Sequence, residues 1–190
     1  MRAVFSAGVM LALAVMLGGC ASLEPVGLPQ AQAELEMKGR VAFRYGSEGG
    51  SASVNWRHAP SFDDMLITGP LGQGIARISR ADQSFTLTTV DGKTYRAPDA
   101  ESLTEAVLGW RLPLAGLPDW IRGRPVAQRP AEVQKDGNGQ VLVILQDAWR
   151  IEYQAWNGAN PARMSLRREA DQNRSAIDLR LVIDELGEAR

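Results

Sequence analysis

The segment Ile177-Asp178-Leu179-Arg180-Leu181-Val182-Ile183-Asp184 carries an apolar side chain at every second position. Successive side chains of a β-strand point to opposite faces, so this pattern predicts a strand with one buried and one wet face. Five other stretches alternate in the same way, and we expect all six to be antiparallel strands with one apolar face. The other five are residues 37–45, 51–56, 84–89, 149–154 and 163–167.

Turn-forming residues separate the alternating stretches. Gly, Asn and Asp tolerate the backbone conformations that tight turns between strands require. We therefore predict turns at Gly49-Gly50, Asp91-Gly92, Asp136-Gly137-Asn138-Gly139 and Asn157-Gly158.

The middle of the chain has a different pattern. Asp99 is a suitable N-cap for a helix over residues 100–108, which Gly109 would end. A second short helix is predicted from near Pro113 to before Gly123. Both would be apolar on one side, and they separate two blocks of strands. The sequence thus predicts a mainly β fold, a strongly curved antiparallel sheet or unclosed β-barrel with the short helices as a lid. Alternation leaves open whether its interior is packed or hollow.

The N-terminal segment is typical of a targeting signal. Arg2 precedes an apolar run over residues 4–17, and small residues follow it up to Cys20. A membrane-spanning helix needs about 20 apolar residues, which this run lacks. We predict a signal peptide over residues 1–19, a tether over residues 20–33 and one folded domain over residues 34–190. A signal anchor or a buried core helix is the alternative.

Composition excludes several classes of function. The net charge of the 190-residue chain is -1, so it lacks the basic surface that nucleic acid or anionic lipid would require. Cys20 is the single cysteine and His58 the single histidine. No intramolecular disulfide, cysteine-based metal site or multi-histidine metal site can form, so we expect no metal and no cofactor.

The acidic residues give little support for an enzyme. Asp63 and Asp64 are adjacent, so on a strand they would point to opposite faces. Asp99 and Glu101 belong to a helix N-terminus, where carboxylates complement the dipole. His58 lies at a strand end, where we expect it to be solvated. We therefore expect a protein without enzymatic activity.

The sequence Leu17-Gly18-Gly19-Cys20 resembles the lipobox of bacterial lipoprotein precursors. The resemblance implies cleavage before Cys20 and covalent lipid on its thiol and new amine. Ala21, in place of an Asp that retains lipoproteins in the inner membrane, implies sorting to the outer membrane. Each buried methylene contributes about 0.8 kcal/mol, so several chains would hold the protein firmly on the membrane.

Seven further segments, in order over about residues 36–185, resemble the outer-membrane lipoprotein receptor family LolB. They are Lys38-Gly39-Arg40-Val41-Ala42-Phe43, Ser53-Val54-Asn55-Trp56, Gly69-Pro70-Leu71-Gly72-Gln73, Pro98-Asp99-Ala100-Glu101, Leu108-Gly109-Trp110-Arg111-Leu112-Pro113-Leu114, Leu117-Pro118-Asp119-Trp120-Ile121-Arg122-Gly123 and Leu179-Arg180-Leu181-Val182-Ile183-Asp184. A different incomplete-barrel lipoprotein is the alternative.

This resemblance implies an apolar cavity inside the unclosed barrel. The cavity would take the acyl chains of triacylated lipoproteins from the periplasmic carrier LolA and release them into the outer membrane. The protein would face the periplasm as a lipid-anchored monomer, with the acyl chains as transient cargo.

The resemblance also implies site residues. Leu71, between Pro70 and Gly72, matches the position of the family's membrane-inserting leucine. A buried turn leucine is the alternative for Leu71, and ordinary core packing is the alternative for each cavity residue. Our candidates for the cavity lining are Phe43, Val54, Trp56, Leu103, Val107, Trp120, Leu179 and Leu181.

A competing function is a structural or envelope-assembly lipoprotein that transfers no lipid. Such a protein would bind protein partners on its strand edges and on an exposed Trp156. A packed interior would favour this function, and a hollow one would favour lipid binding.

Overall fold

The computed structural model describes residues 33–81, 83–172 and 174–188. The predicted signal peptide, Cys20 and all but the last residue of the predicted tether lie outside the described residues. Within the described part, no helix is long and apolar enough to cross a membrane.

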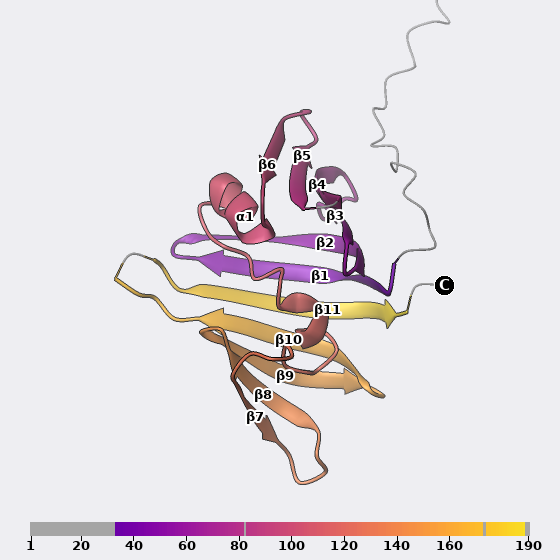
Figure 1. The fold of residues 1–190 in the computed structure, drawn as a ribbon, viewed down its shortest axis with the longest axis vertical. Coiled ribbons are helices and arrows are strands. Elements are labelled where there is room, and N and C mark those ends of the chain that lie inside the picture. The colour runs from indigo at the N-terminus through magenta and orange to yellow at the C-terminus, as the bar shows by residue number, and fades with distance from the viewer. Residues whose placement is uncertain (1–32, 82, 173, 189–190) are drawn as a thin grey trace, which may run out of the picture.

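One antiparallel sheet of eleven strands makes up most of the described chain (Figure 1). Its spatial order is β6-β5-β4-β3-β2-β1-β11-β10-β9-β8-β7, so all neighbours are consecutive in sequence except β1 and β11. The strands are β1 (Leu35–Tyr45), β2 (Glu48–Ala59), β3 (Phe62–Thr68), β4 (Gly74–Ala81), β5 (Ser84–Thr89), β6 (Thr94–Ala97), β7 (Ala131–Lys135), β8 (Val141–Gln146), β9 (Trp149–Asn157), β10 (Asn160–Arg168) and β11 (Ile177–Gly187).

The sheet curves strongly and stays open. β6 and β7 are its two edges, and the chain between them crosses the concave side with helices α1 (Ala100–Leu108) and α2 (Leu117–Trp120) (Figure 1). We call residues 98–130, which include both helices, the lid. The predicted fold class, an unclosed antiparallel barrel with short helices over its concave face, is confirmed.

Helix α1 has the predicted boundaries. The Asp99 carboxylate accepts a hydrogen bond from the Ser102 backbone N–H at 2.7 Å, and this bond lowers the pKa of Asp99. Gly109 ends the helix in the left-handed conformation, with φ of 77°.

The second helix is shorter than predicted. It covers only Leu117–Trp120, while residues 112–116 form turns. Pro118 explains the difference, because it has no N–H to bond a carbonyl four residues back in a helix that begins at Pro113.

Three of the four predicted turns are confirmed, and the one at Gly49-Gly50 is wrong. The chain reverses at Gly46, whose φ is 58°, and Gly49 and Gly50 lie within β2. The Phe43 ring covers Gly50, so that a Cβ on Gly50 would lie 2.9 Å from that ring.

Five strands lie outside the six alternating stretches, namely β3, β4, β6, β7 and β8. In β8 both faces carry apolar side chains, so its sequence Val141-Leu142-Val143-Ile144-Leu145-Gln146 has no period of two. Such a run predicts a buried segment without distinguishing a strand from a helix.

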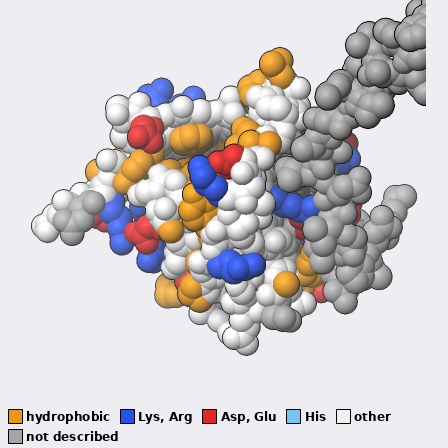
Figure 2. Space-filling model, turned by 90° about the horizontal axis from the view of Figure 1, so that it is seen from above, with side chains coloured by type: hydrophobic (Ala, Val, Ile, Leu, Met, Phe, Trp, Pro, Cys, Tyr) orange, Lys and Arg blue, Asp and Glu red, His pale blue; other side chains and the backbone are white. Residues whose placement is uncertain are grey.

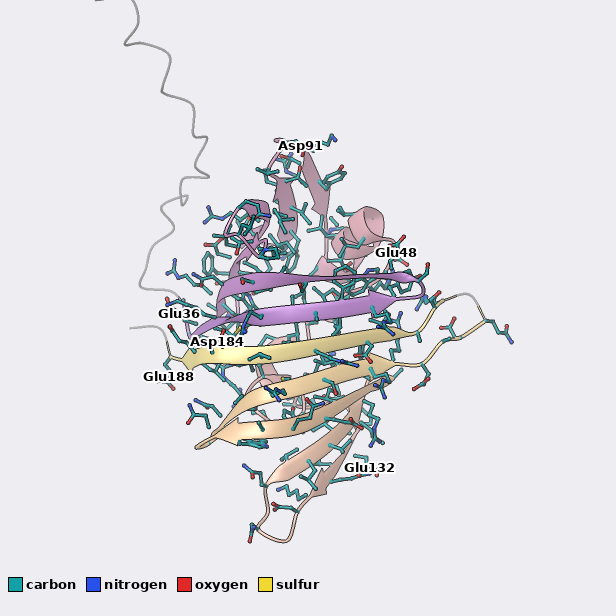
Figure 3. The ribbon with its side chains drawn as sticks, turned by 180° about the vertical axis from the view of Figure 1, so that it is seen from behind. Glu36, Glu48, Asp91, Glu132, Asp184 and Glu188 are labelled. Atoms are coloured by element: carbon teal, nitrogen blue, oxygen red, sulfur yellow. The ribbon has the colours of Figure 1, made fainter. Side chains whose placement is uncertain are left out.

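The β1–β11 pairing joins the two ends of the domain in the middle of the sheet. On its convex side, Arg40 pairs with Asp184 at 2.9 Å and Lys38 with Glu185 at 2.7 Å. Figure 3 shows this side of the sheet, with Asp184 labelled on β11. These exposed pairs contribute at most about 1 kcal/mol each. On the concave side, Val41 lies opposite Leu181 and supplies apolar packing.

Gly39 allows the closest approach in this pairing. A bulge between Lys38 and Gly39 brings β1 so near β11 that a Cβ on Gly39 would lie 2.4 Å from the Val182 carbonyl oxygen. Backbone atoms cannot swing aside as a flexible side chain can, so any larger residue must push the strands apart.

We expect Gly39→Ala to lower the free energy of unfolding by about 1–3 kcal/mol, because the added methyl group overpacks the junction. Gly137→Ala is the matched control, since nothing lies within 4 Å of a Cβ at this turn glycine. The control should change stability by no more than about 0.5 kcal/mol. Denaturant unfolding measures both variants, and equal stabilities would contradict the tight β1–β11 contact.

Candidate functional site

A cavity of about 410 Å³ lies between the concave face of the sheet and the lid. Its lining comes from β1 to β5 and β11 on one side and from the lid on the other. The volume lies within the range of about 300–1,000 Å³ that is usual for ligand sites. The interior is therefore hollow, which the alternation of the strands could not show.

The lining is almost wholly apolar. Polar groups near it make their hydrogen bonds elsewhere. Thr104 Oγ1 donates to the Glu101 carbonyl at 3.1 Å and accepts from the Leu112 N–H at 2.9 Å. Arg40 contributes to the wall while its guanidinium pairs with Asp184 on the convex side. A cavity of this kind favours hydrocarbon over water, because water needs polar partners to be stable inside a protein.

Six of the eight candidate residues lie together in this lining. They are Phe43, Val54, Trp56, Val107, Leu179 and Leu181. Their distribution over β1, β2, α1 and β11 shows that the cavity spans the β1–β11 junction. Their contact with acyl chains stays a prediction.

The other two candidates, Leu103 and Trp120, are outside the lining. Leu103 is fully buried in the hydrophobic core. The Trp120 indole N–H donates to Gln146 Oε1 at 2.9 Å, on β8, and Tyr153 donates to the Trp120 carbonyl at 2.7 Å. Burial raises the pKa of Tyr153, which keeps its hydroxyl protonated as a donor. Trp120 therefore fixes the lid to the β8–β9 half of the sheet.

Sequence reasoning missed part of the lid's contribution. Trp110, which is not among our cavity candidates, lies in the cavity wall with its ring 5.9 Å from that of Phe43. Leu114, Leu117 and Ile121 also line the cavity. The sequence shows that the lid is apolar at these positions. The direction in which these side chains point depends on turns, which the periodicity of the sequence does not describe.

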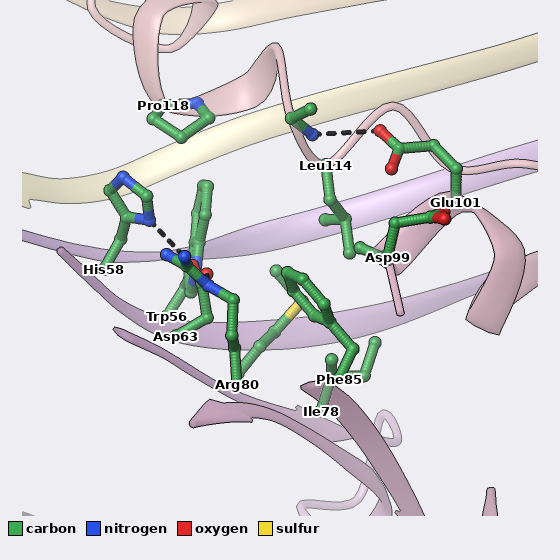
Figure 4. A pocket seen from close by; sticks show the side chains of 13 residues that line it. Trp56, His58, Asp63, Ile78, Arg80, Phe85, Asp99, Glu101, Leu114 and Pro118 are labelled. Atoms are coloured by element: carbon green, nitrogen blue, oxygen red, sulfur yellow. Dashed lines mark hydrogen bonds and ion pairs between the residues drawn. The ribbon is translucent and has the colours of Figure 1, made fainter. Parts of the chain in front are cut away.

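A second pocket of about 260 Å³ shares Trp56 and Leu114 with the cavity wall (Figure 4). Asp63 lies at its base and accepts three hydrogen bonds from side chains of β2 and β4. The donors are Trp56 Nε1 at 3.0 Å, His58 Nδ1 at 2.7 Å and Arg80 Nε at 2.6 Å.

This network corrects the expectation for His58. Its side chain is only 18% exposed and is bound to Asp63, so it is not solvated. Asp63 and Asp64 face opposite sides as expected, because Asp64 pairs with Arg77 at 2.6 Å. The residues lining this pocket include no Ser, Thr, Cys or Lys that His58 could activate. The network binds the ends of β2, β3 and β4 together.

The described residues contain no group of three or more His, Cys, Asp or Glu side chains arranged to hold a metal ion.

Leu71 lies in the loop between β3 and β4 with 93% of its side chain exposed. The Gln73 side chain supports the loop from within, since its Oε1 accepts a hydrogen bond from the Leu71 N–H at 3.1 Å. Gly72, with φ of 81°, completes the turn. The arrangement presents an apolar tip to the surroundings, which is costly in water unless another apolar phase receives it.

Comparison with known proteins shows similarity to a family of outer-membrane lipoproteins. The family model described as "Outer membrane lipoprotein LolB" matches residues 33–185. A protein named outer-membrane lipoprotein LolB from Thiobacillus denitrificans is 35% identical over 182 residues, covering 93% of this chain and 94% of the relative. A protein of the same name from Chromobacterium violaceum is 35% identical over 84% of this chain and 90% of its own length.

A solved structure described as a LolA superfamily protein from Nitrosomonas europaea is similar over 84% of this chain and 87% of that chain. The TM-score is 0.47 and the identity is 9%, so this likeness is distant.

We expect Ala52→Phe to weaken binding of a fluorescent fatty acid about tenfold or more, because Ala52 lines the cavity and a phenyl ring would displace several methylenes at about 0.8 kcal/mol each. Ser53→Phe is the control, since the next side chain of β2 lies on the other face. Fluorescence titration gives both dissociation constants. Equal weakening by the two variants would show that the fatty acid binds elsewhere.

Proposed function

The chain belongs to the outer-membrane lipoprotein LolB family, and we propose that its cavity binds the acyl chains of lipoproteins delivered by the periplasmic carrier LolA before they pass into the outer membrane. The protein is an outer-membrane lipoprotein and not an enzyme. We further propose that residues 1–19 are removed, that Cys20 carries the lipid anchor and that residues 20–33 tether the domain. One chain forms the whole cavity, so a monomer suffices.

The hollow apolar interior is the observation that carries this proposal. Exposing three acyl chains to water would cost tens of kcal/mol at about 0.8 kcal/mol per methylene. A cavity lined by hydrocarbon removes that cost during the crossing between carrier and membrane. A structural lipoprotein that only bound partners on its outer strands would need no such space.

The lid is fixed to the sheet chiefly at its two ends, by α1 on β5 and β6 and by Trp120 on β8 and β9. We propose that the lid moves and widens the cavity when a triacyl anchor enters.

The contacts of the lid indicate where it opens. Helix α1 packs on β5 and β6, whereas α2 is held to β8 and β9 through Trp120 and Tyr153. Between the helices, the Ala115 N–H donates to Glu101 Oε1 at 3.1 Å and Arg111 pairs with Glu105 at 2.7 Å. These links are exposed and weak, and Trp110 and Leu114 hold the same segment through apolar contacts in the cavity wall, so we propose that residues 109–116 move when acyl chains enter.

Release needs an affinity gradient that ends in the bilayer. Leu71 supplies an apolar tip worth about 1.5–3 kcal/mol when buried. That energy is too small to recruit a soluble domain, but it is enough to orient one that Cys20 already holds at the membrane. Docking the tip would place the cavity next to the bilayer, where the acyl chains are more stable.

We expect Leu71→Glu to accept cargo from LolA at the normal rate and to insert it into vesicles at least tenfold more slowly, because a carboxylate cannot enter hydrocarbon. Leu71→Met retains an apolar tip and should insert cargo normally. A transfer assay with loaded LolA and vesicles separates the two steps. Normal insertion by Leu71→Glu would contradict the role of the loop.

We expect Cys20→Ala to give a soluble protein that still takes cargo from loaded LolA, because the cavity lies wholly within residues 37–183. Membrane fractionation and gel filtration of the cargo complex measure the two properties. A variant that remained in the membrane fraction would show that the anchor lies elsewhere in the chain.

A further inference from the structure

Exposed hydrophobic side chains gather at one end of the described sheet. Leu71 is 93% exposed, Val90 64%, Leu108 44% and Ile75 42%. We call these four residues the apolar rim. Single exposed hydrophobic residues are ordinary on a protein surface, but a group at one end of a molecule marks a contact with another apolar phase.

The topology brings the rim together. Leu71 lies in the loop before β4 and Val90 in the turn after β5, and β4 pairs with β5 so that Ala76 lies opposite Thr89. The Val90 N–H donates to the Ile75 carbonyl at 3.1 Å, which fixes the turn beside the start of β4.

The rim is continuous with the cavity. Ile75 and Leu108, the last residue of α1, both line the cavity and are also exposed, so they stand at its opening. Viewed from the end at which the β5–β6 turn lies, the surface shows hydrophobic side chains in several places (Figure 2). An acyl chain leaving past Ile75 would therefore meet apolar groups on its way out.

The turn that carries Val90 has no net charge. Its two charged residues, Asp91 and Lys93, pair with each other at 2.7 Å. Lys93 and the Thr89 hydroxyl lower the pKa of Asp91 to about 2, so the pair stays ionised and balanced at neutral pH. The turn can approach a membrane surface without repulsion from anionic headgroups.

The predicted tether is long enough for the lipid anchor and the apolar rim to lie in the same membrane. The described chain begins at the other end of β3, where Leu35 pairs with His58 beside the β2–β3 turn. Thirteen residues separate Cys20 from the domain in our prediction, and the fourteen Cα–Cα steps from residue 20 to residue 34 can extend at most about 50 Å. A strand of twelve residues such as β2 spans roughly 40 Å, so the anchor can lie in the same membrane that the rim contacts.

From these observations we propose that the whole apolar rim, with Val90 as a second insertion point beside Leu71, enters the boundary between lipid headgroups and acyl chains. The opening of the cavity then faces the bilayer directly, and cargo chains pass between two apolar phases without crossing water. This inference rests on the proposed function and extends its membrane contact from one loop to a surface.

A fluorescent probe tests the contact in the lipidated protein. Cys20 carries lipid there, so Val90→Cys, Leu71→Cys or Leu142→Cys provides a single free thiol for an environment-sensitive dye. Leu142 is the matched control, since it is 43% exposed but lies on β8 in the other half of the sheet. The vesicles contain phosphatidylethanolamine and phosphatidylglycerol with bromine on the acyl chains.

We expect bromine to quench the dyes at positions 71 and 90 and to leave the dye at position 142 unchanged. Quenching at position 71 without quenching at position 90 would contradict insertion of the whole rim and would leave the proposed role of the Leu71 loop intact. Quenching at neither position would contradict the membrane step of the proposed function itself.

A transfer assay tests the consequence. Val90→Glu should take cargo from loaded LolA normally and insert it into the same vesicles about tenfold more slowly, whereas Leu142→Glu should insert it at the normal rate. If Val90→Glu instead loses uptake and inserts preloaded cargo normally, the rim docks the carrier and the proposal is wrong. Val90 is exposed in a turn, and equal melting temperatures of both variants confirm folding.

Discussion

The concave face of the sheet is apolar and must be covered, yet the protein covers it without filling it. The lid spans this face and is fixed at its two ends, by α1 on the β5–β6 side and by Trp120 on the β8–β9 side. The side chains between these points do not meet closely enough to close the space. Burying the apolar face stabilises the fold at about 25 cal/mol per Å². The remaining hollow forgoes packing contacts, which is the condition for binding hydrocarbon.

The two ends of the cavity differ in character. Near one end, the Asp63 network with Trp56, His58 and Arg80 joins β2, β3 and β4 through buried hydrogen bonds. Such bonds are strong and resist opening. At the other end, the apolar rim has few polar contacts and exposes hydrocarbon. This contrast supports the proposed exit of acyl chains at the rim.

Local patterns predicted the fold class well. Alternation identified β1 and β11, which pair along almost their whole length, and the residues Asp99 and Gly109 fixed both ends of α1. The predictions that failed concern residues whose environment is set by contacts with other strands. His58 was expected in solvent because it lies at a strand end before Ala59-Pro60, whereas Asp63 and Arg80 enclose it only after β2, β3 and β4 have paired. Likewise, Gly50 belongs to a strand that pairs with Phe43 across the hairpin, and Phe43 is distant from it in the sequence pattern that predicted a turn.

The hollow interior was beyond sequence reasoning for a physical reason. Alternation shows which side chains share a face, but the depth of a cavity depends on how far the opposing layer stands away. Leu103 and Val107 lie one helical turn apart on α1, and only Val107 reaches the cavity. The most direct test is a cargo lipoprotein with a photoactivatable group in its acyl chain, loaded from LolA and irradiated before vesicles are added. We predict crosslinks to cavity residues such as Val54 and Val107; crosslinks confined to the convex surface would contradict the account.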